Sequence, residues 1–156
     1  ERGGGGRGGG GGGGRGGKRV GLGGLGGGAG GYDMSVDALE VAQSYAEKAG
    51  VKIKTVEAKH DTFAFGEGQW DLIVCAYCYM QPNEDQWPEI FWKALRPGGL
   101  VVFQTSVSRP IKVGELAERW KRFRLVRLED LDAGVVDNDW VPSKTNPTSK
   151  LVVRKE

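Results

Sequence analysis

The sequence predicts an α/β fold built on a mostly parallel sheet, and three observations lead to this prediction. Two apolar runs, WDLIVCAYCYM at 70–80 and LVVFQTS at 100–106, have the composition of strands that are buried on both faces. Segments with helical spacing of apolar residues alternate with these runs. Turn sequences, GEGQ at 66–69 and RPGG at 96–99, separate the elements. This alternation favours one parallel sheet with helices on both faces.

The first element predicted after the glycine-rich N-terminal end is a helix over 35–49. Ser35 suits the N-cap position, because its hydroxyl can accept a hydrogen bond from a free backbone N–H. Asp37 falls in the first turn, where the helix dipole favours a carboxylate. Apolar residues then recur at helical spacing, and Gly50 follows as a stop signal.

The later elements are predicted in the same way, from the spacing of apolar residues and from the turn residues between them. VKIKTVEA alternates apolar and polar residues as a strand does, whereas QWPEIFWKAL and KVGELAERWKR have helical spacing. In order, the sequence predicts a strand over 51–58, a strand over 70–80, a helix over 86–95, a strand over 100–106, a helix over 112–122, and strands over 123–131 and 150–154. No helix separates the last two strands, which predicts an antiparallel hairpin at the sheet edge.

Composition divides the chain into two parts. Residues 1–31 contain 21 of the 28 glycines and form a glycine- and arginine-rich segment, while residues 32–156 have an ordinary composition that can support a core. The formal net charge is +2, but the basic excess belongs to residues 1–31, and the remainder is slightly acidic. The globular part therefore lacks the basic surface that DNA binding requires.

The glycine-rich segment raises a second functional hypothesis, RNA binding through residues 2–17. Three Arg-Gly-Gly triplets begin at Arg2, Arg7 and Arg15. Flexible tracts of this kind bind RNA through phosphate contacts and guanidinium stacking, without a fold of their own. The aromatic residues that usually interleave such tracts are absent before Tyr32. RNA binding is therefore the alternative function rather than the leading one.

The cysteine and histidine content argues against a metal or redox site. Cys75 and Cys78 lie in one apolar run, where residues three apart in a strand point to opposite faces, so we expect two buried thiols and a reducing compartment. His60 is the only histidine, and it is either a general base or a solvated loop residue. No stretch approaches the roughly 20 apolar residues that span a bilayer. We expect a soluble, cytoplasmic protein without a metal.

Three sequence motifs follow one another along the chain: GYDMSVDALEVAQ at 31–43, GQWDLIVCAY at 68–77 and LRPGGLVVFQTS at 95–106. In this order they resemble the class I S-adenosylmethionine-dependent methyltransferases, and look most like the small tellurite-resistance and thiol type. The resemblance covers residues 31–156. It implies a seven-stranded, mostly parallel Rossmann-like sheet with a C-terminal antiparallel hairpin.

The resemblance also implies a cofactor site for S-adenosylmethionine across the carboxyl ends of the strands. A G-x-G-x-G loop would let the backbone approach the cofactor, and Asp33 would accept hydrogen bonds from the ribose hydroxyls. The alternative for Asp33 is a carboxylate that serves only the helix N-terminus. The implied cofactor-binding residues are Gly12, Gly14, Gly16, Asp33, Met34, Asp61, Thr62 and Cys75, and Tyr77 and Tyr79 either line the methyl-acceptor pocket or pack in the core.

The glycine-rich segment departs from the family pattern. The first strand is expected at about 4–11 and the first helix at 16–27, with Leu22 on its apolar side, yet both stretches are mostly glycine. We therefore expect a first strand that is poorly packed, because it has few side chains, and a first helix that is short or frayed. The predicted function is methyl transfer from S-adenosylmethionine to a small-molecule nucleophile, with no catalytic residue identified. The alternative is a catalytically inactive domain that carries an RNA-binding segment.

Overall fold

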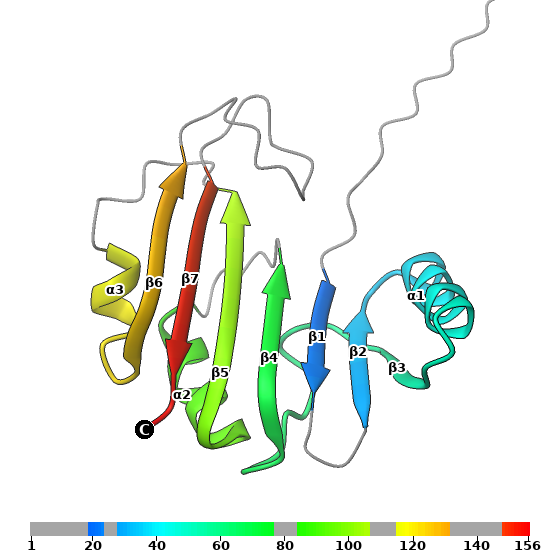
Figure 1. Cartoon of the computed structure of the whole chain (residues 1–156), viewed down its shortest axis with the longest axis horizontal. Coiled ribbons are helices and arrows are strands. Elements are labelled where there is room, and N and C mark those ends of the chain that lie inside the picture. The colour runs from blue at the N-terminus through cyan, green and yellow to red at the C-terminus, as the bar shows by residue number, and fades with distance from the viewer. Residues whose placement is uncertain (1–18, 24–27, 77–83, 107–114, 132–147) are drawn as a thin grey trace, which may run out of the picture.

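The computed structural model describes residues 19–23, 28–76, 84–106, 115–131 and 148–156. Within these residues the chain forms one seven-stranded sheet with α-helices packed against it (Figure 1). The strands are β1 (Arg19–Gly23), β2 (Ala29–Asp33), β3 (Ile53–Glu57), β4 (Trp70–Ala76), β5 (Leu95–Ser106), β6 (Arg124–Leu131) and β7 (Thr148–Arg154). The helices are α1 (Val36–Lys48), α2 (Trp87–Ala94), which follows a 3₁₀ turn at Glu84–Gln86, and α3 (Glu115–Arg119).

The strand order across the sheet is β3-β2-β1-β4-β5-β7-β6. Strands β2 and β3 pair in parallel, as do β4 and β5, whereas β1 is antiparallel to both of its neighbours, β2 and β4. Strand β7 is likewise antiparallel to β5 and to β6. Strands β1 and β7 therefore run against the other strands, and four of the six neighbouring pairs are antiparallel. The predicted α/β class is confirmed, but the sheet is mixed rather than mostly parallel.

The glycine-rich segment differs from its prediction. A helix was expected over 16–27, but residues 19–23 form β1, in which Leu22 lies opposite Gly30 on one side and Ile73 on the other. Glycine costs about 1 kcal/mol relative to alanine inside a helix. In a central strand, by contrast, each backbone N–H and C=O can pair with a neighbouring strand, and no side chain is needed. The expected first strand at 4–11 lies outside the described residues.

Helix α1 matches its predicted bounds to within one residue at each end. Ser35 is the N-cap, and its Oγ accepts a hydrogen bond from the Ala38 N–H at 3.3 Å. Asp37 lies in the first turn, as predicted. Gly50 follows the helix with a φ of 69°, a left-handed conformation that glycine adopts without a Cβ clash.

Strand β5 begins five residues earlier than predicted. Leu95 leaves α2 in an extended conformation and pairs with Trp70 of β4, so the predicted turn RPGG lies inside the strand assignment. Gly98 has a φ of 81°, and its N–H donates to the Lys155 carbonyl at 2.8 Å. The other predicted elements are present with shifted bounds, except that 77–80 and 112–114 lie outside the described residues.

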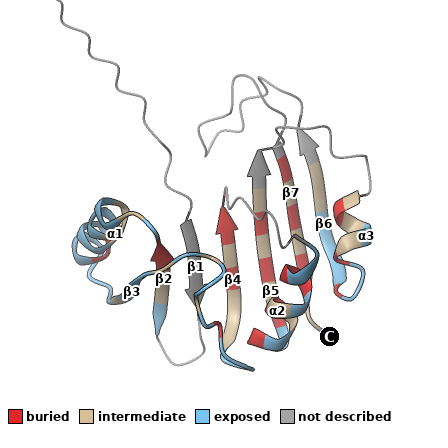
Figure 2. Cartoon of the chain, turned by 180° about the vertical axis from the view of Figure 1, so that it is seen from behind, coloured by how far each residue is buried: buried red, intermediate tan, exposed pale blue. Residues whose placement is uncertain are grey.

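One face of the sheet holds the hydrophobic core, and α2 and α3 cover it (Figure 2). Ile73, Val101 and Leu151 point to this face from three neighbouring strands, and each is 0% exposed. Aromatic rings fill the layer between sheet and helices. Phe91 of α2, for example, lies 5.8 Å from Trp120, which follows α3, measured between ring centroids. The covered face therefore contains the tightly packed part of the molecule.

The other face of the same strands is less buried. Side chains alternate along a strand, so Leu72, Val102 and Val152 point away from the core. All three are intermediate in exposure. This face is apolar in composition, as the sequence predicts, but only partly shielded from water.

Helix α1 lies on this second face, at the β2–β3 end of the sheet. Tyr32 points into the core, and its register partner is Val56 of β3. The preceding residue, Thr55, must therefore point to the opposite face. Its Oγ1 accepts a hydrogen bond from Gln43 Nε2 of α1 at 2.6 Å, which places the helix there.

Candidate functional site

The carboxyl ends of β2, β3, β4 and β5 lie at one edge of the sheet, because these strands share a direction (Figure 1). In open α/β sheets this edge is where ligands bind. Asp33 is the last residue of β2 and Ala76 the last of β4. Because β1 runs the opposite way, its first residue, Arg19, lies at this edge and pairs with Ala76.

Asp33 is a buried carboxylate at the end of β2. The residue is 8% exposed, and its Oδ1 accepts a hydrogen bond from the Ser35 N–H at 2.8 Å. Its other oxygen, Oδ2, is buried and has no hydrogen-bond partner within the described part of the chain. A buried carboxylate oxygen without a donor costs free energy, so the site suits a ligand that supplies hydroxyl donors.

Tyr32 precedes Asp33 and points to the core face. Its Oη lies 3.0 Å from His60 Nδ1, and its ring stacks on Phe63 at 4.1 Å between centroids. Burial, and secondarily the negative charge of Asp33, raise the pKa of the Tyr32 phenol well above its ordinary value. The phenol therefore stays protonated at neutral pH and can donate its hydrogen to His60 Nδ1.

The segment 58–69 runs from β3 across the covered face to β4. Its start is tied to β2, because the Ala58 N–H donates to the Asp33 carbonyl at 3.1 Å. Thr62 closes a turn in which its Oγ1 lies 3.2 Å from the Lys59 carbonyl. Asp61 and Thr62 are both exposed in this turn.

The structure brings some of the sequence-predicted residues together. Asp33 and Met34 lie at the end of β2, where Met34 is 57% exposed, and Asp61 and Thr62 lie in the turn that follows β3. The predicted Gly12, Gly14, Gly16, Tyr77 and Tyr79 lie outside the described residues, as do the Arg-Gly-Gly triplets of the RNA-binding hypothesis.

Cys75 differs from its prediction as a buried thiol. It is buried in β4 between Val20 of β1 and Phe103 of β5, and it is disulfide-bonded. The prediction rested on one continuous strand that carries both cysteines to opposite faces, and the structure describes this strand as far as Ala76. Cys78 lies outside the described residues. The Cys75 side chain belongs to the core, one residue before the carboxyl edge.

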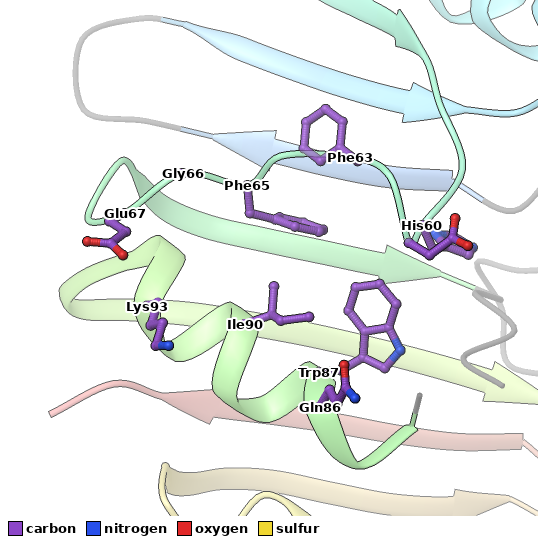
Figure 3. Close-up of a pocket in the computed structure, with 10 residues that line it drawn as sticks. His60, Phe63, Phe65, Gly66, Glu67, Gln86, Trp87, Ile90 and Lys93 are labelled. Carbon is purple, nitrogen blue, oxygen red and sulfur yellow. The ribbon is translucent and has the colours of Figure 1, made fainter. Parts of the chain in front are cut away.

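A pocket of about 400 Å³ lies between segment 58–69 and α2 (Figure 3). Its lining residues are His60, Asp61, Phe63, Phe65, Gly66, Glu67, Gln86, Trp87, Ile90 and Lys93. The sequence analysis did not predict this pocket. The available signal was weak: two phenylalanines two residues apart after β3, and an aromatic residue and an isoleucine three residues apart on the next helix.

Trp87 contributes a second buried polar atom without a partner. The residue is 4% exposed, and its Nε1 has no hydrogen-bond partner among the residues that the structure describes. Buried polar atoms are nearly always paired in native proteins. The two exceptions, Asp33 Oδ2 and Trp87 Nε1, belong to the carboxyl end of β2 and to the pocket wall.

The fold defines an α/β domain whose candidate ligand site is the edge formed by the carboxyl ends of its strands. Residues 10–99 match the family described as a methyltransferase domain, and because this match covers more than half of the chain, the protein belongs to that family. Comparison with curated protein sequences finds no significant match. The class I methyltransferase resemblance is confirmed at this level.

Solved structures with the same fold include proteins of different activity. TehB from Haemophilus influenzae superposes with a TM-score of 0.61 and 14% identity, over 80% of this chain and 49% of that one. A SAM-dependent methyltransferase from Methanosarcina mazei gives 0.57 and 10%, over 80% of each chain. The [4+2]-cyclase SpnF gives 0.59 and 13%, over 80% of this chain and 64% of that one.

These likenesses show the fold, and one fold can support several chemistries. The chain spans about half the length of TehB and about two thirds of the length of SpnF. Among the described residues, no helix is long and apolar enough to cross a membrane. The function must therefore be argued from the site.

Proposed function

We propose that this domain binds S-adenosylmethionine and transfers its methyl group to a small-molecule nucleophile. The observation that carries the proposal is Asp33, a buried carboxylate at the end of β2 whose Oδ2 has no partner within the described residues. A ribose offers two neighbouring hydroxyl donors to such an oxygen. The match of residues 10–99 to a methyltransferase family supports the choice of cofactor.

The surroundings of Asp33 favour a neutral donor over a cation. Its Oδ1 is already held by the Ser35 N–H, which fixes the carboxylate plane, and the N-terminus of α1 follows directly. A helix N-terminus stabilises negative charge, so it offsets part of the cost of burying the carboxylate. Hydroxyl groups can then complete its hydrogen bonds without bringing in a further charge.

The direction of β1 supports a role for the glycines that precede it. Arg19 lies at the carboxyl edge, opposite Ala76 of β4, and it follows Gly16 by three residues. In the proposal, Gly12, Gly14 and Gly16 supply backbone N–H groups to the cofactor. In the family pattern this loop follows a parallel first strand, whereas here the chain would enter the same edge before an antiparallel one.

The other proposed contacts divide between adenine and acceptor. Met34, Asp61 and Thr62 lie next to Asp33 or in the turn after β3, where the adenine end would lie. Tyr77 and Tyr79 follow β4 in the sequence and are proposed to line the acceptor side, where aromatic faces suit a sulfonium cation. Acceptors of the small tellurite-resistance and thiol type and a cytoplasmic location belong to the same proposal.

S-adenosylmethionine supplies a methyl carbon that is already activated by a positively charged sulfur. The acceptor's lone pair forms the new bond to that carbon as the carbon–sulfur bond breaks, and S-adenosylhomocysteine leaves. The protein's part is to hold the reactants in line, a contribution that can reach about 7–11 kcal/mol. No residue is assigned as a base, because alignment alone accounts for the step with a nucleophile that carries a free lone pair.

The test is a calorimetric titration of the full chain with S-adenosylhomocysteine, together with two carboxylate variants. Asp33→Asn keeps the shape and the acceptor for Ser35 but removes the charge, so binding should weaken by about 1–3 kcal/mol, roughly tenfold or more. Asp37→Asn is the matched control, because it removes an exposed carboxylate four residues further along the chain, in the first turn of α1. Absence of binding at millimolar ligand, or equal losses in the two variants, would contradict the proposal.

A further inference from the structure

Apart from Asp61, which the proposed function places at the adenine end of the cofactor, the residues that line the pocket between segment 58–69 and α2 have no assigned role in cofactor binding. Its two ends differ (Figure 3): His60, Trp87 and Gln86 lie toward the end at which β4 points, and Glu67 and Lys93 lie toward the other. The volume of about 400 Å³ falls in the lower part of the roughly 300–1,000 Å³ range of small-molecule sites. It is large enough for a one- or two-ring molecule.

Aromatic rings line the pocket, and they stand at right angles to one another. Phe63 and Phe65 make an interplanar angle of 84° at 5.0 Å between centroids. Trp87 is inclined by 77° to Phe65 at 6.1 Å and by 85° to His60 at 6.0 Å. Perpendicular walls offer both ring faces and ring edges, which are the two surfaces that a further aromatic ring prefers to contact.

The walls are held in place from behind. Phe63 stacks on the buried Tyr32 at 13° and 4.1 Å, and the Tyr32 hydroxyl lies 3.0 Å from His60 Nδ1. Phe65 and Trp87 are both buried and also contact Phe91 of α2. A pocket whose walls are fixed by packing loses little conformational entropy when a rigid ligand enters.

The charged groups of the pocket lie at its rim. Asp61, Glu67 and Lys93 are exposed, and Lys93 Nζ lies 3.8 Å from Glu89 in an i,i+4 ion pair. None of these three charges is buried in the pocket. A cation that left water for the interior would therefore lose hydration without gaining a buried counter-charge. Attraction of the cation to the aromatic ring faces would offset only part of that loss, so the chemistry favours a neutral occupant.

We propose that this pocket binds a neutral aromatic ring. The identification of this ring with the methyl acceptor rests on the proposed function. The affinity of the pocket for an aromatic ring is independent of the proposed function. The proposal selects an aromatic acceptor over an aliphatic or a cationic one.

Three probes of similar size separate these classes in an NMR-monitored titration of the full chain. Phenol and cyclohexanol share a hydroxyl and a six-membered ring and differ in aromaticity, and tetramethylammonium tests a cation. We expect phenol to bind at least fivefold more tightly than cyclohexanol, and tetramethylammonium to bind more weakly than either. Equal affinities for phenol and cyclohexanol, or tighter binding of the cation, would overturn the proposal.

A variant that fills the pocket locates the binding. Ile90→Trp places a large side chain between the walls, and the dissociation constant for phenol should rise at least tenfold. Val41→Trp is the matched control, because Val41 is an exposed residue of α1 and receives the same side chain outside the pocket. If Ile90→Trp fails to fold by circular dichroism, Ile90→Phe replaces it. Unchanged phenol affinity in the folded variant would overturn the proposal.

The same variants distinguish the two proposals. Ile90→Trp should leave S-adenosylhomocysteine binding unchanged, whereas Asp33→Asn should weaken that binding and leave phenol binding unchanged. Phenol binding without any S-adenosylhomocysteine binding would refute the proposed function and leave the ring site standing. The reverse result would refute the ring site alone.

Discussion

The two faces of the sheet differ in how completely their apolar side chains are covered. On the face under α2 and α3, Ile73, Val101 and Leu151 are fully buried, while their strand neighbours Val102 and Val152 on the other face are intermediate. The amino-acid types are nearly the same on both sides. An apolar run in a strand therefore indicates that both faces of the strand can be buried. How much stability each residue contributes depends on how completely helices cover its face of the sheet.

The largest effect is expected on the covered face, from Phe91→Ala. Phe91 is 1% exposed and contacts Phe65, Trp87 and Trp120, so removal of its ring leaves a cavity among aromatic side chains. The free energy of unfolding should fall by about 3–5 kcal/mol. Urea denaturation measures it from the shift of the midpoint at constant slope. A loss below about 1 kcal/mol would show that this face is loosely packed.

A matched pair of valines on β5 compares the faces directly. Val101 is 0% exposed on the covered face, and Val102 points to the other face. Val101→Ala should destabilise the fold by about 2 kcal/mol and Val102→Ala by about 1 kcal/mol or less, because less area returns to water. Both are measured by the same denaturation experiment. Equal losses would mean that the second face is as well covered as the first.

The smallest effect is expected from Tyr32→Phe, at the β2 end of the covered face. The substitution removes the hydrogen bond between the Tyr32 hydroxyl and His60, and the free energy of unfolding should fall by about 1 kcal/mol near neutral pH. Since burial raises the pKa of Tyr32 in the folded state, the unfolded chain ionises first. The hydroxyl's contribution is therefore complete below about pH 10 and is lost as pH rises through the higher folded-state pKa.

Thermal midpoints of wild type and Tyr32→Phe, measured from pH 8 to 11, should thus converge as the pH rises. Tyr45→Phe is the control, since Tyr45 is 63% exposed on α1, and its midpoints should follow those of wild type throughout. A constant gap between wild type and Tyr32→Phe would contradict the raised pKa.

Elements with local signals were predictable from the sequence, and those that depend on distant partners were not. Helix α1 was placed to within a residue because Ser35 and Gly50 act through their own backbone neighbours. Strand β1 was missed because its glycines carry no periodicity, and its pairing is decided by β2 and β4. The start of β5 was missed because Leu95 becomes a strand residue through pairing with Trp70, 25 positions away.

The candidate site divides in the same way. Asp33 was identified through the resemblance to the methyltransferase family, and it is the last residue of β2 in the structure. The pocket was not foreseen, because Phe63 and Ile90 meet only when segment 58–69 and α2 lie on the same face. Cys75 is buried, as predicted, but the predicted free thiol was wrong because the residue is disulfide-bonded.

Because β1 runs antiparallel to β2, the connection between these two strands in the middle of the sheet can be short. Parallel neighbours need a crossover of a dozen or more residues, whereas antiparallel neighbours can be joined by a short connection. Five residues separate Gly23 from Ala29. The entropy of closing so short a loop is small, so β1 and β2 can pair through contacts that are local in sequence. A segment too rich in glycine to form a crossover helix can thus still supply the strand that joins the two halves of the sheet.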